Sequence, residues 1–238
     1  MSQAVVTDIE GTLGPVAFVR EVLFPYAAAA LPGFVRDHAG DPQVAALLAE
    51  AARRGGVAAT DLDGITRCLL DWIAADAKVT PLKALQGLIW EQGYRSGQFR
   101  APVYPDALQR LRAWQEAGVP VYVYSSGSIR AQDLYFAHSD QGDLRPLLRG
   151  FFDTTSGPKT DPESYRRIAA AIGVAPQDLL FLSDLTPELD AAAAAGLRTT
   201  WLVRPGDTTA DAAQIKLSRH PIARDFGEIA GPARRFDP

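Results

Sequence analysis

The sequence has few of the features that mark secreted, membrane-bound or nucleic-acid-binding proteins. It contains a single cysteine, Cys68, which excludes an internal disulfide and is typical of a reducing compartment. The formal net charge is -4, so the chain offers no electrostatic attraction to nucleic acid or to an anionic membrane. No apolar run approaches the length that spans a bilayer, and the N-terminus lacks the pattern of a secretory signal. We therefore expect a cytoplasmic protein that binds neither nucleic acid nor membrane.

The rest of the composition is that of an ordinary globular protein. Of the 238 residues, 47% are hydrophobic and 22% are charged, which suits one α/β domain or a domain with an insertion. Cys68 lies in the amphipathic helical pattern "GITRCLLDWIAAD". We interpret it as a small core residue and not as a nucleophile.

The hydrophobic pattern divides the chain into two kinds of region. After a short apolar run at residues 4–9, helical spacing continues to about residue 98. From about residue 105, short runs rich in β-branched and aromatic residues alternate with helical segments, which is typical of βαβ units. We predict an α/β fold, a Rossmann-like and mainly parallel sheet flanked by helices. Its core takes residues 1–25 and 101–238, and a helical domain is inserted at residues 26–100.

Several local signals refine this outline. Pro25 and Pro32 should interrupt the first helical segment, and Asp61 is a candidate N-cap. Thr80 is expected to cap a further helix, with Pro81 at its first position. From about residue 210 the pattern weakens, and we predict a closing helix followed by a loose tail.

Reactive side chains gather at the predicted carboxyl ends of the strands, where open parallel sheets bind their ligands. The stretch "AVVTDIEGT" supplies two acids, "VYVYSSGS" a cluster of hydroxyls and amides, and "SGPKTD" a lysine. "FLSD" ends in another acid, with Thr186 and Glu188 just beyond. The candidates are Asp8, Glu10, Ser125, Ser126, Lys159 and Asp184.

This set favours phosphoryl transfer, which requires a nucleophile, donors for the phosphate oxygens and neutralised charge. Asp8 can attack phosphorus to form an aspartyl-phosphate. Because a carboxylate and a phosphate repel, a divalent cation should bridge them, and Asp8, Asp184 and a backbone carbonyl suit Mg²⁺. Lys159 would offset the remaining negative charge.

Two further roles complete the hypothesis. Ser125 and the amides after it precede a helix, and a helix N-terminus is a natural site for an anion. Glu10 points to the same side as Asp8 if strand geometry persists, so it can protonate the leaving oxygen and then activate water. Taken singly, each of these residues would be read as a turn residue, a helix cap or a solvated lysine. Their joint placement at successive strand ends favours a site.

The chain resembles the haloacid dehalogenase-like phosphatase superfamily. "DIEGT" corresponds to its first motif, "VYVYSS" to the second, Lys159 to the third and "FLSD" to the fourth. The predicted helical insert occupies the place of that superfamily's cap domain, which shapes substrate choice.

From about Val5 to Gly206 the resemblance narrows to the enolase-phosphatases of methionine salvage, which have Glu where most of the superfamily has Asp, here Glu10. The stretches that carry it are "DIEGT", "AFVREVLFPYA", "LKALQGLIWEQGY", "VYVYSSGSIRAQDLYFAHSDQGDL" and "FFDTTSGPKTDPESYRRIA". The resemblance implies a Mg²⁺-dependent phosphoric monoester hydrolase that acts as a monomer. Its substrate would be 2,3-diketo-5-methylthiopentyl-1-phosphate, which is enolised and then dephosphorylated to the acireductone.

The resemblance also implies roles for individual residues. One Mg²⁺ per subunit would be held by Asp8, the Glu10 carbonyl and Asp184. Ser125 and Ser126 would hold the phosphate or the diketone, and Lys159 would contact the phosphate. The base that abstracts the enolisation proton stays open between Glu10 and a carboxylate of the helical insert such as Glu91.

One departure from the family pattern bears on specificity. The family usually continues "DIEGT" with Thr or Ser, whereas this chain has Leu13 and Gly14. We hypothesise that these two residues line the substrate entrance. Three alternatives to an enolase-phosphatase stay open: a related phosphatase for another small metabolite, a binding protein without activity on the same fold, and a hydrolytic dehalogenase. The last needs no metal and usually lacks an acid at the position of Glu10.

Overall fold

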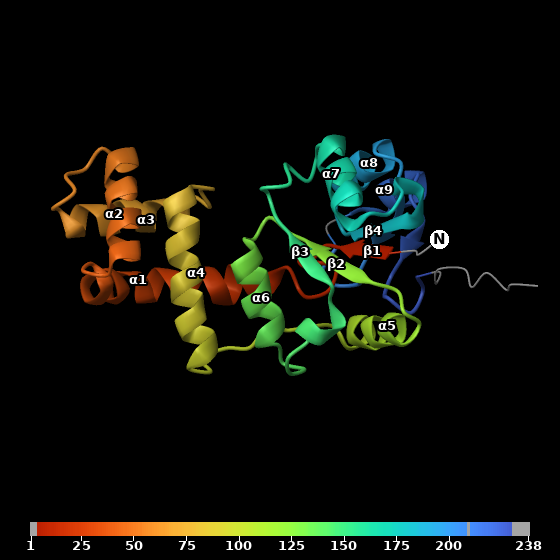
Figure 1. The fold of residues 1–238 in the computed structure, drawn as a ribbon, viewed down its shortest axis with the longest axis horizontal. Coiled ribbons are helices and arrows are strands. Elements are labelled where there is room, and N and C mark those ends of the chain that lie inside the picture. Colours follow the sequence, from red (N-terminus) through yellow and green to blue (C-terminus); the bar gives the residue numbers. More distant parts are fainter. Residues whose placement is uncertain (1–3, 209, 230–238) are drawn as a thin grey trace, which may run out of the picture. The chain divides into compact units, whose positions relative to one another are not determined.

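The structure is a computed structural model that describes residues 4–208 and 210–229 (Figure 1). The chain forms two compact units, one of Met1–Val16 with Ala101–Pro238 and one of Ala17–Arg100. The chain leaves the first unit after Val16, earlier than the residue 25 that we predicted, because helical structure of the second unit begins well before Pro25. We call them the α/β unit and the helical unit.

A parallel six-stranded sheet forms the centre of the α/β unit, in the order β3-β2-β1-β4-β5-β6. Its strands are β1 (Ala4–Thr7), β2 (Val121–Tyr124), β3 (Gly150–Phe152), β4 (Leu179–Ser183), β5 (Arg198–Leu202) and β6 (Ile222–Ala223). Each neighbouring pair is parallel, which confirms the predicted Rossmann-like fold. The strand order reverses beside β1, and such a reversal opens a crevice at the carboxyl ends of the strands. β6 was not predicted, and residues 230–238 of the predicted tail lie outside the described residues.

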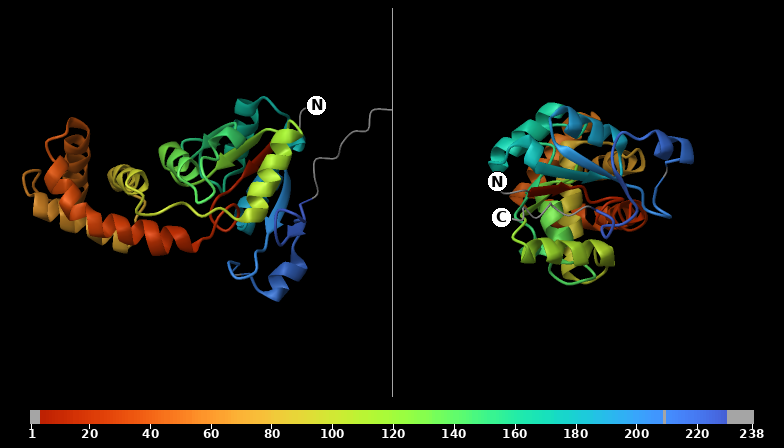
Figure 2. Two further views of the ribbon diagram at one scale, coloured as in Figure 1. Left: turned by 90° about the horizontal axis from the view of Figure 1, so that it is seen from below. Right: turned by 90° about the vertical axis from the view of Figure 1, so that its right-hand side faces the viewer.

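Helices cover both faces of this sheet, so its central strands are buried (Figure 2). These helices are α5 (Pro105–Glu116), α6 (Ile129–Ala137), α7 (Pro162–Ile172), α8 (Thr186–Ala194) and α9 (Ala212–Leu217), with short 3-10 turns at Arg145–Leu147 and Pro176–Asp178. α7 and α8 lie on one face and α5 on the other (Figure 2). Against β1 and β4, α7 and α8 pack large apolar side chains such as Ile168 and Leu189. This packing fixes the strand ends that carry the polar residues.

The helical unit consists of a π-helical turn (Val19–Leu23) that runs into α1 (Phe24–His38), followed by α2 (Pro42–Gly55), α3 (Leu62–Ala74) and α4 (Thr80–Arg95). The predicted interruptions do not occur. Pro25 lies in the first turn of α1, where its missing N–H is tolerated, and Pro32 lies inside the helix. The tight core on one face of α1, including Leu31 and Val35, offsets the hydrogen bond that a proline inside a helix loses.

The cap predictions for this unit had mixed outcomes. Asp61 caps α3, since its side chain accepts a hydrogen bond from the Gly64 N–H at 2.8 Å, which confirms that prediction. The prediction that Thr80 caps α4 was wrong, because Val79 occupies the N-cap position and Thr80 is the first helical residue. Cys68 is half-buried in α3. Within the described residues, no helix is long and apolar enough to cross a membrane.

Candidate active site

The segment after β1 folds into a tight loop, residues 9–14, which we call the Glu10 loop. The Ile9 carbonyl accepts hydrogen bonds from the N–H groups of Thr12, Leu13 and Gly14 at 3.1, 2.8 and 3.0 Å. Just before the loop, the Asp8 N–H donates to the Leu182 carbonyl of β4 at 2.9 Å. Asp8 is therefore held by the sheet itself, whereas Glu10 sits on a compact turn and is half-buried.

Gly11 brings this loop against the end of β4. Its φ of +70° lies in the left-handed region, which L side chains rarely adopt. A Cβ atom at this position would lie only 2.4 Å from Oδ2 of Asp184. The glycine therefore permits a close approach between the Glu10 loop and the Asp184 carboxylate.

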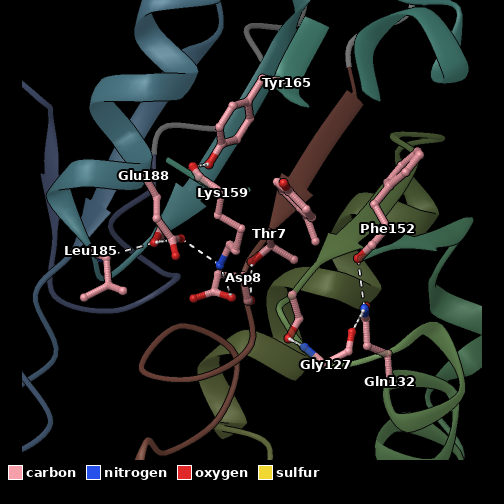
Figure 3. Close-up of polar contacts among 12 residues, drawn as sticks. Thr7, Asp8, Gly127, Gln132, Phe152, Lys159, Tyr165, Leu185 and Glu188 are labelled. Carbon is pink, nitrogen blue, oxygen red and sulfur yellow. Dashed lines mark hydrogen bonds and ion pairs between the residues drawn. The ribbon is translucent and has the colours of Figure 1, made fainter. Parts of the chain in front are cut away.

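Lys159 lies between two buried carboxylates (Figure 3). Its Nζ is 2.6 Å from Oδ1 of Asp8 and 2.7 Å from Oε2 of Glu188. Burial lowers the pKa of Lys159, but the carboxylates of Asp8 and Glu188 outweigh that effect and raise it. Lys159 is therefore a fixed cation beside Asp8. Its carbonyl accepts a hydrogen bond from the Tyr165 hydroxyl at 2.7 Å, which orients the backbone from which it projects.

Glu188 is a further residue of this site, and its sequence position alone predicted no role for it. It is buried in the first turn of α8, and the Ser183 hydroxyl donates to its Oε2 at 2.9 Å. Burial, and then the charge of Asp8, raise its pKa. Its position four residues after Asp184, on the helix that the strand feeds, is the signal in the sequence that could have indicated a second acid.

Asp184 directly follows the carboxyl end of β4 and is half-buried. Burial, followed by the charge of Asp8, raises its pKa to about 7. Among the described residues, its Oδ1 is a buried side-chain oxygen without a hydrogen-bond partner, while its backbone carbonyl accepts a hydrogen bond from Trp201 Nε1 at 2.8 Å. Such a carboxylate is costly to ionise unless a cation reaches it.

The oxygens at this point fit a small divalent cation. Asp8 directly precedes the Glu10 loop, and Asp184 lies against Gly11 of that loop. Their carboxylates are hard oxygen donors, and Mg²⁺ prefers one or two carboxylates and keeps several waters. Within the part of the chain that the structure describes, no group of three or more His, Cys, Asp or Glu side chains could hold a metal. A cation here would therefore rely on two carboxylates together with backbone and water oxygens.

The loop after β2 lies beside Asp8 in the sheet, because β2 pairs with β1. Ser125 is buried, and its Oγ accepts a hydrogen bond from the Gly127 N–H at 3.1 Å. Gln132 holds this loop from α6, since its Nε2 donates to the carbonyls of Gly127 and Phe152 at 2.9 and 2.8 Å (Figure 3). Ser126 is exposed. The loop therefore presents Ser125 on a rigid support and Ser126 toward solvent.

The structure brings Asp8, Lys159 and Asp184 to one edge of the sheet, as predicted from their positions after successive strands. It contradicts the hypothesis for Leu13 and Gly14. Leu13 is fully buried, and a Cβ at Gly14 would lie 2.1 Å from the Tyr135 hydroxyl. Both residues therefore pack the α/β unit and do not line an entrance. Glu91 belongs to the helical unit, where it forms an ion pair of 2.7 Å with Arg95.

The chain is similar to proteins of one hydrolase family over most of its length. Residues 3–196 match the family model described as haloacid dehalogenase-like hydrolase. The chain is 54% identical over 227 residues to enolase-phosphatase E1 of Pseudomonas aeruginosa strain UCBPP-PA14, covering 95% of this chain and 97% of that protein. It is also 54% identical over 229 residues to enolase-phosphatase E1 of Granulibacter bethesdensis, covering 96% and 95%.

A solved structure agrees with these matches. The UTR4 protein of Saccharomyces cerevisiae superposes with a TM-score of 0.81 at 34% sequence identity, covering 96% of this chain and 100% of that one. The similarity therefore spans the α/β unit and the helical unit alike.

Proposed function

The chain belongs to the haloacid dehalogenase-like hydrolases and, among them, is an enolase-phosphatase, and we propose that it converts 2,3-diketo-5-methylthiopentyl-1-phosphate to the acireductone and phosphate. One observation carries this proposal. Lys159 bridges the buried carboxylates of Asp8 and Glu188, next to a strand end that carries Asp184. A nucleophile, a fixed cation and a place for a second cation are what phosphoryl transfer requires.

Phosphoryl transfer would begin at Asp8. Its carboxylate oxygen attacks phosphorus, the bond between phosphorus and the ester oxygen breaks, and an aspartyl-phosphate forms. Glu10 donates a proton to the departing oxygen. Water then attacks phosphorus of the aspartyl-phosphate while Glu10 accepts its proton, which releases phosphate and restores Asp8.

The phosphate oxygens would be held by groups from neighbouring strand ends. Lys159 supplies a positive charge, and its two carboxylate partners keep it protonated. Ser125 and Ser126 supply hydroxyls, and the amides before α6 add dipoles. Hydrogen bonds fix both Lys159 and the loop after β2. Little reorganisation of these groups is therefore needed when negative charge develops on the phosphate oxygens.

We propose Asp8, the Glu10 carbonyl and Asp184 as the ligands of one Mg²⁺. When bound, the ion would neutralise charge between carboxylates and phosphate and would polarise oxygens of the substrate. The buried Oδ1 of Asp184, which has no hydrogen-bond partner among the described residues, supports this assignment. A bound cation would favour the ionised carboxylate and so offset the rise that burial causes in its pKa.

Enolisation requires that a proton leave the carbon that bears the phosphate ester, with the carbonyl beside it becoming an enol. Glu10 is our candidate for the base, because the Glu10 loop lies against Asp184. The small phosphorylated diketone is the binding partner that we propose for this site, as its substrate. We further propose that the enzyme acts as a monomer in the cytoplasm.

The experiment is to supply the diketone phosphate and to follow acireductone absorbance and free phosphate together. We expect both products in equal amounts, loss of both with a chelator, and recovery with Mg²⁺. Phosphate without the enol would indicate a phosphatase for another small metabolite. Activity that is indifferent to chelation would contradict the proposed Mg²⁺ site.

A further inference from the structure

A buried arginine far along the chain contacts the Glu10 loop. Arg204 follows β5 and is only 6% exposed. Its Nε donates a hydrogen bond of 2.9 Å to the carbonyl of Thr12, two residues after Glu10. An arginine is rarely buried unless its donors are satisfied and its charge is paired, so this contact is part of an extended arrangement.

The rest of the Arg204 guanidinium contacts one carboxylate and two aromatic rings. Its Nη1 and Nη2 donate to the two carboxylate oxygens of Asp106 at 3.3 and 2.9 Å. Its flat face lies 3.8 Å from the ring centroid of Tyr104 and 5.4 Å from that of Phe226. Such a forked, stacked geometry suits arginine and cannot be reproduced by lysine.

The same network reaches the Glu10 loop by a second route. The backbone N–H of Tyr104, the residue on which Arg204 stacks, donates to the Leu13 carbonyl at 2.9 Å. Successive carbonyls of the loop, at Thr12 and Leu13, are therefore both held from outside through Arg204 and its stacking partner. Inside the loop, three N–H groups donate to the Ile9 carbonyl, so the loop residues are tied to one another.

We propose that Arg204 is a positioning residue that holds the Glu10 loop where Glu10 can transfer protons. This inference rests on the proposed role of Glu10. Gly11 leaves no room for a Cβ beside the Asp184 carboxylate, so a displacement of the loop would shift Glu10 and also change the packing against Asp184. Small displacements of catalytic groups cost up to about 100-fold in rate, so the contact should affect turnover more than binding.

The test uses a variant that removes the whole ion pair, because removing one partner of a buried pair leaves an unpaired charge and can prevent folding. In Arg204→Met with Asp106→Asn, the amide at position 106 can still accept the Phe226 N–H that Asp106 accepts at 2.9 Å. We expect kcat to fall about 10- to 100-fold with KM changed about 3-fold or less. Amide hydrogen exchange in residues 9–14 should become faster.

Arg110→Met is the matched control. Arg110 lies on α5 and donates to the carbonyls of Phe226, Gly227 and Ile229 at 2.9, 3.1 and 3.2 Å, so it holds the segment that Arg204 also touches. Its hydrogen bonds go to that segment and none of them to the Glu10 loop. We expect this variant to lose stability while kcat and exchange in residues 9–14 stay at the wild-type values.

Arg204→Lys separates an effect on the position of the loop from an effect on stability. It also provides the test if the double variant does not fold. Lysine keeps the charge beside Asp106 but cannot also reach the Thr12 carbonyl in the same geometry. We expect its melting temperature to approach that of the wild type while kcat stays low. Recovery of kcat together with stability, or exchange in residues 9–14 equal to that of Arg110→Met, would overturn the proposal.

The two proposals fail in different ways. If the wild type does not turn over the diketone phosphate, the proposed function is lost. Hydrogen exchange still decides whether Arg204 holds the loop, and turnover of 4-nitrophenyl phosphate still decides whether that matters for catalysis.

Discussion

The α/β unit and the helical unit differ in what they bury. Within residues 17–100, the buried side chains carry no charge, and their polar groups are the Gln86 amide and the Tyr94 hydroxyl. The α/β unit buries Asp8, Lys159, Glu188 and Arg204. Burying charge costs free energy that must be offset by pairing, so this unit carries a cost that the helical unit avoids. The difference indicates that the residues buried in the α/β unit are chosen for their chemistry, whereas those buried in the helical unit are chosen for their packing.

The largest expected effect comes from removing the nucleophile. Asp8→Asn should fold, because Lys159 keeps Glu188 as a partner, but kcat should fall by about 10⁴-fold or more. Steady-state phosphate release measures this. Asp63→Asn, a similar change at an exposed position of α3, is the control and should leave kcat unchanged. Comparable kcat values in Asp8→Asn and Asp63→Asn would contradict the assignment of the nucleophile to the α/β unit.

A packing change in the helical unit should have the opposite signature. Leu69 is fully buried in α3, and Leu69→Ala should cost about 2–5 kcal/mol of unfolding free energy. Turnover of 4-nitrophenyl phosphate per folded molecule should stay near the wild-type value. Denaturant unfolding and activity at a temperature where the variant is folded test both parts. Leu62→Ala, at a side chain that is 38% exposed, should be much milder. A large loss of kcat in folded Leu69→Ala would place part of the chemistry in the helical unit.

The buried acids should make stability depend on pH. Since the folded pKa of Asp184, about 7, lies above its unfolded value, the folded state binds more protons between the two. The metal-free protein should therefore lose stability as pH rises from about 4 to about 7, by on the order of 2–4 kcal/mol. The raised pKa of Glu188 acts in the same direction. Lys159, whose folded pKa is also raised, loses its contribution only above about pH 10.

Melting temperatures at pH 5 and pH 8, with EDTA or with Mg²⁺, test this prediction. Mg²⁺ should raise the melting temperature more at pH 8, where the carboxylates are ionised. Asp184→Asn should flatten the pH response and remove most of the Mg²⁺ effect. A melting temperature of the metal-free protein that rises between pH 5 and pH 8 would contradict the direction of these shifts.

The smallest effect is expected at a helix cap. Asp61→Ala removes the acceptor for the Gly64 N–H and should cost about 1 kcal/mol of stability, with kcat unchanged. Asp61→Asn keeps an acceptor and should lie within a few tenths of a kcal/mol of the wild type. Thermal unfolding of the two variants measures the difference. Equal losses in both would show that the cap does not stabilise α3.

The sequence allowed the fold and the gathering of Asp8, Lys159 and Asp184 to be predicted because both follow from topology. Parallel strands bring their carboxyl ends to one edge, so residues that follow successive strands meet there. The patterns of period two and period 3.6 are local, and they located nearly all of the helices and strands.

The remaining features depend on tertiary contacts that no local pattern encodes. Glu188 acquires its importance from Lys159, which projects from a different loop. Arg204 meets Thr12 across 192 residues of sequence. Leu13 and Gly14 were misassigned because Tyr135 and Pro102, which pack against Gly14, are distant in the chain. Pro32 stays inside α1 because the core around it compensates for a local preference.

Rapid acid quenching of Glu10→Gln during turnover of 4-nitrophenyl phosphate tests most directly whether Asp8 receives the phosphoryl group. This substrate needs no enolisation, and 4-nitrophenolate leaves without a general acid, so only the hydrolysis of the aspartyl-phosphate depends on Glu10. Without the base that activates water, the intermediate should accumulate. Peptide mass spectrometry is then expected to find the peptide that contains Asp8 heavier by one phosphoryl group, and to find no such peptide in Asp8→Asn. Phosphate release by Glu10→Gln without any phosphorylated Asp8 peptide, or with the phosphoryl group on another residue, would contradict the account.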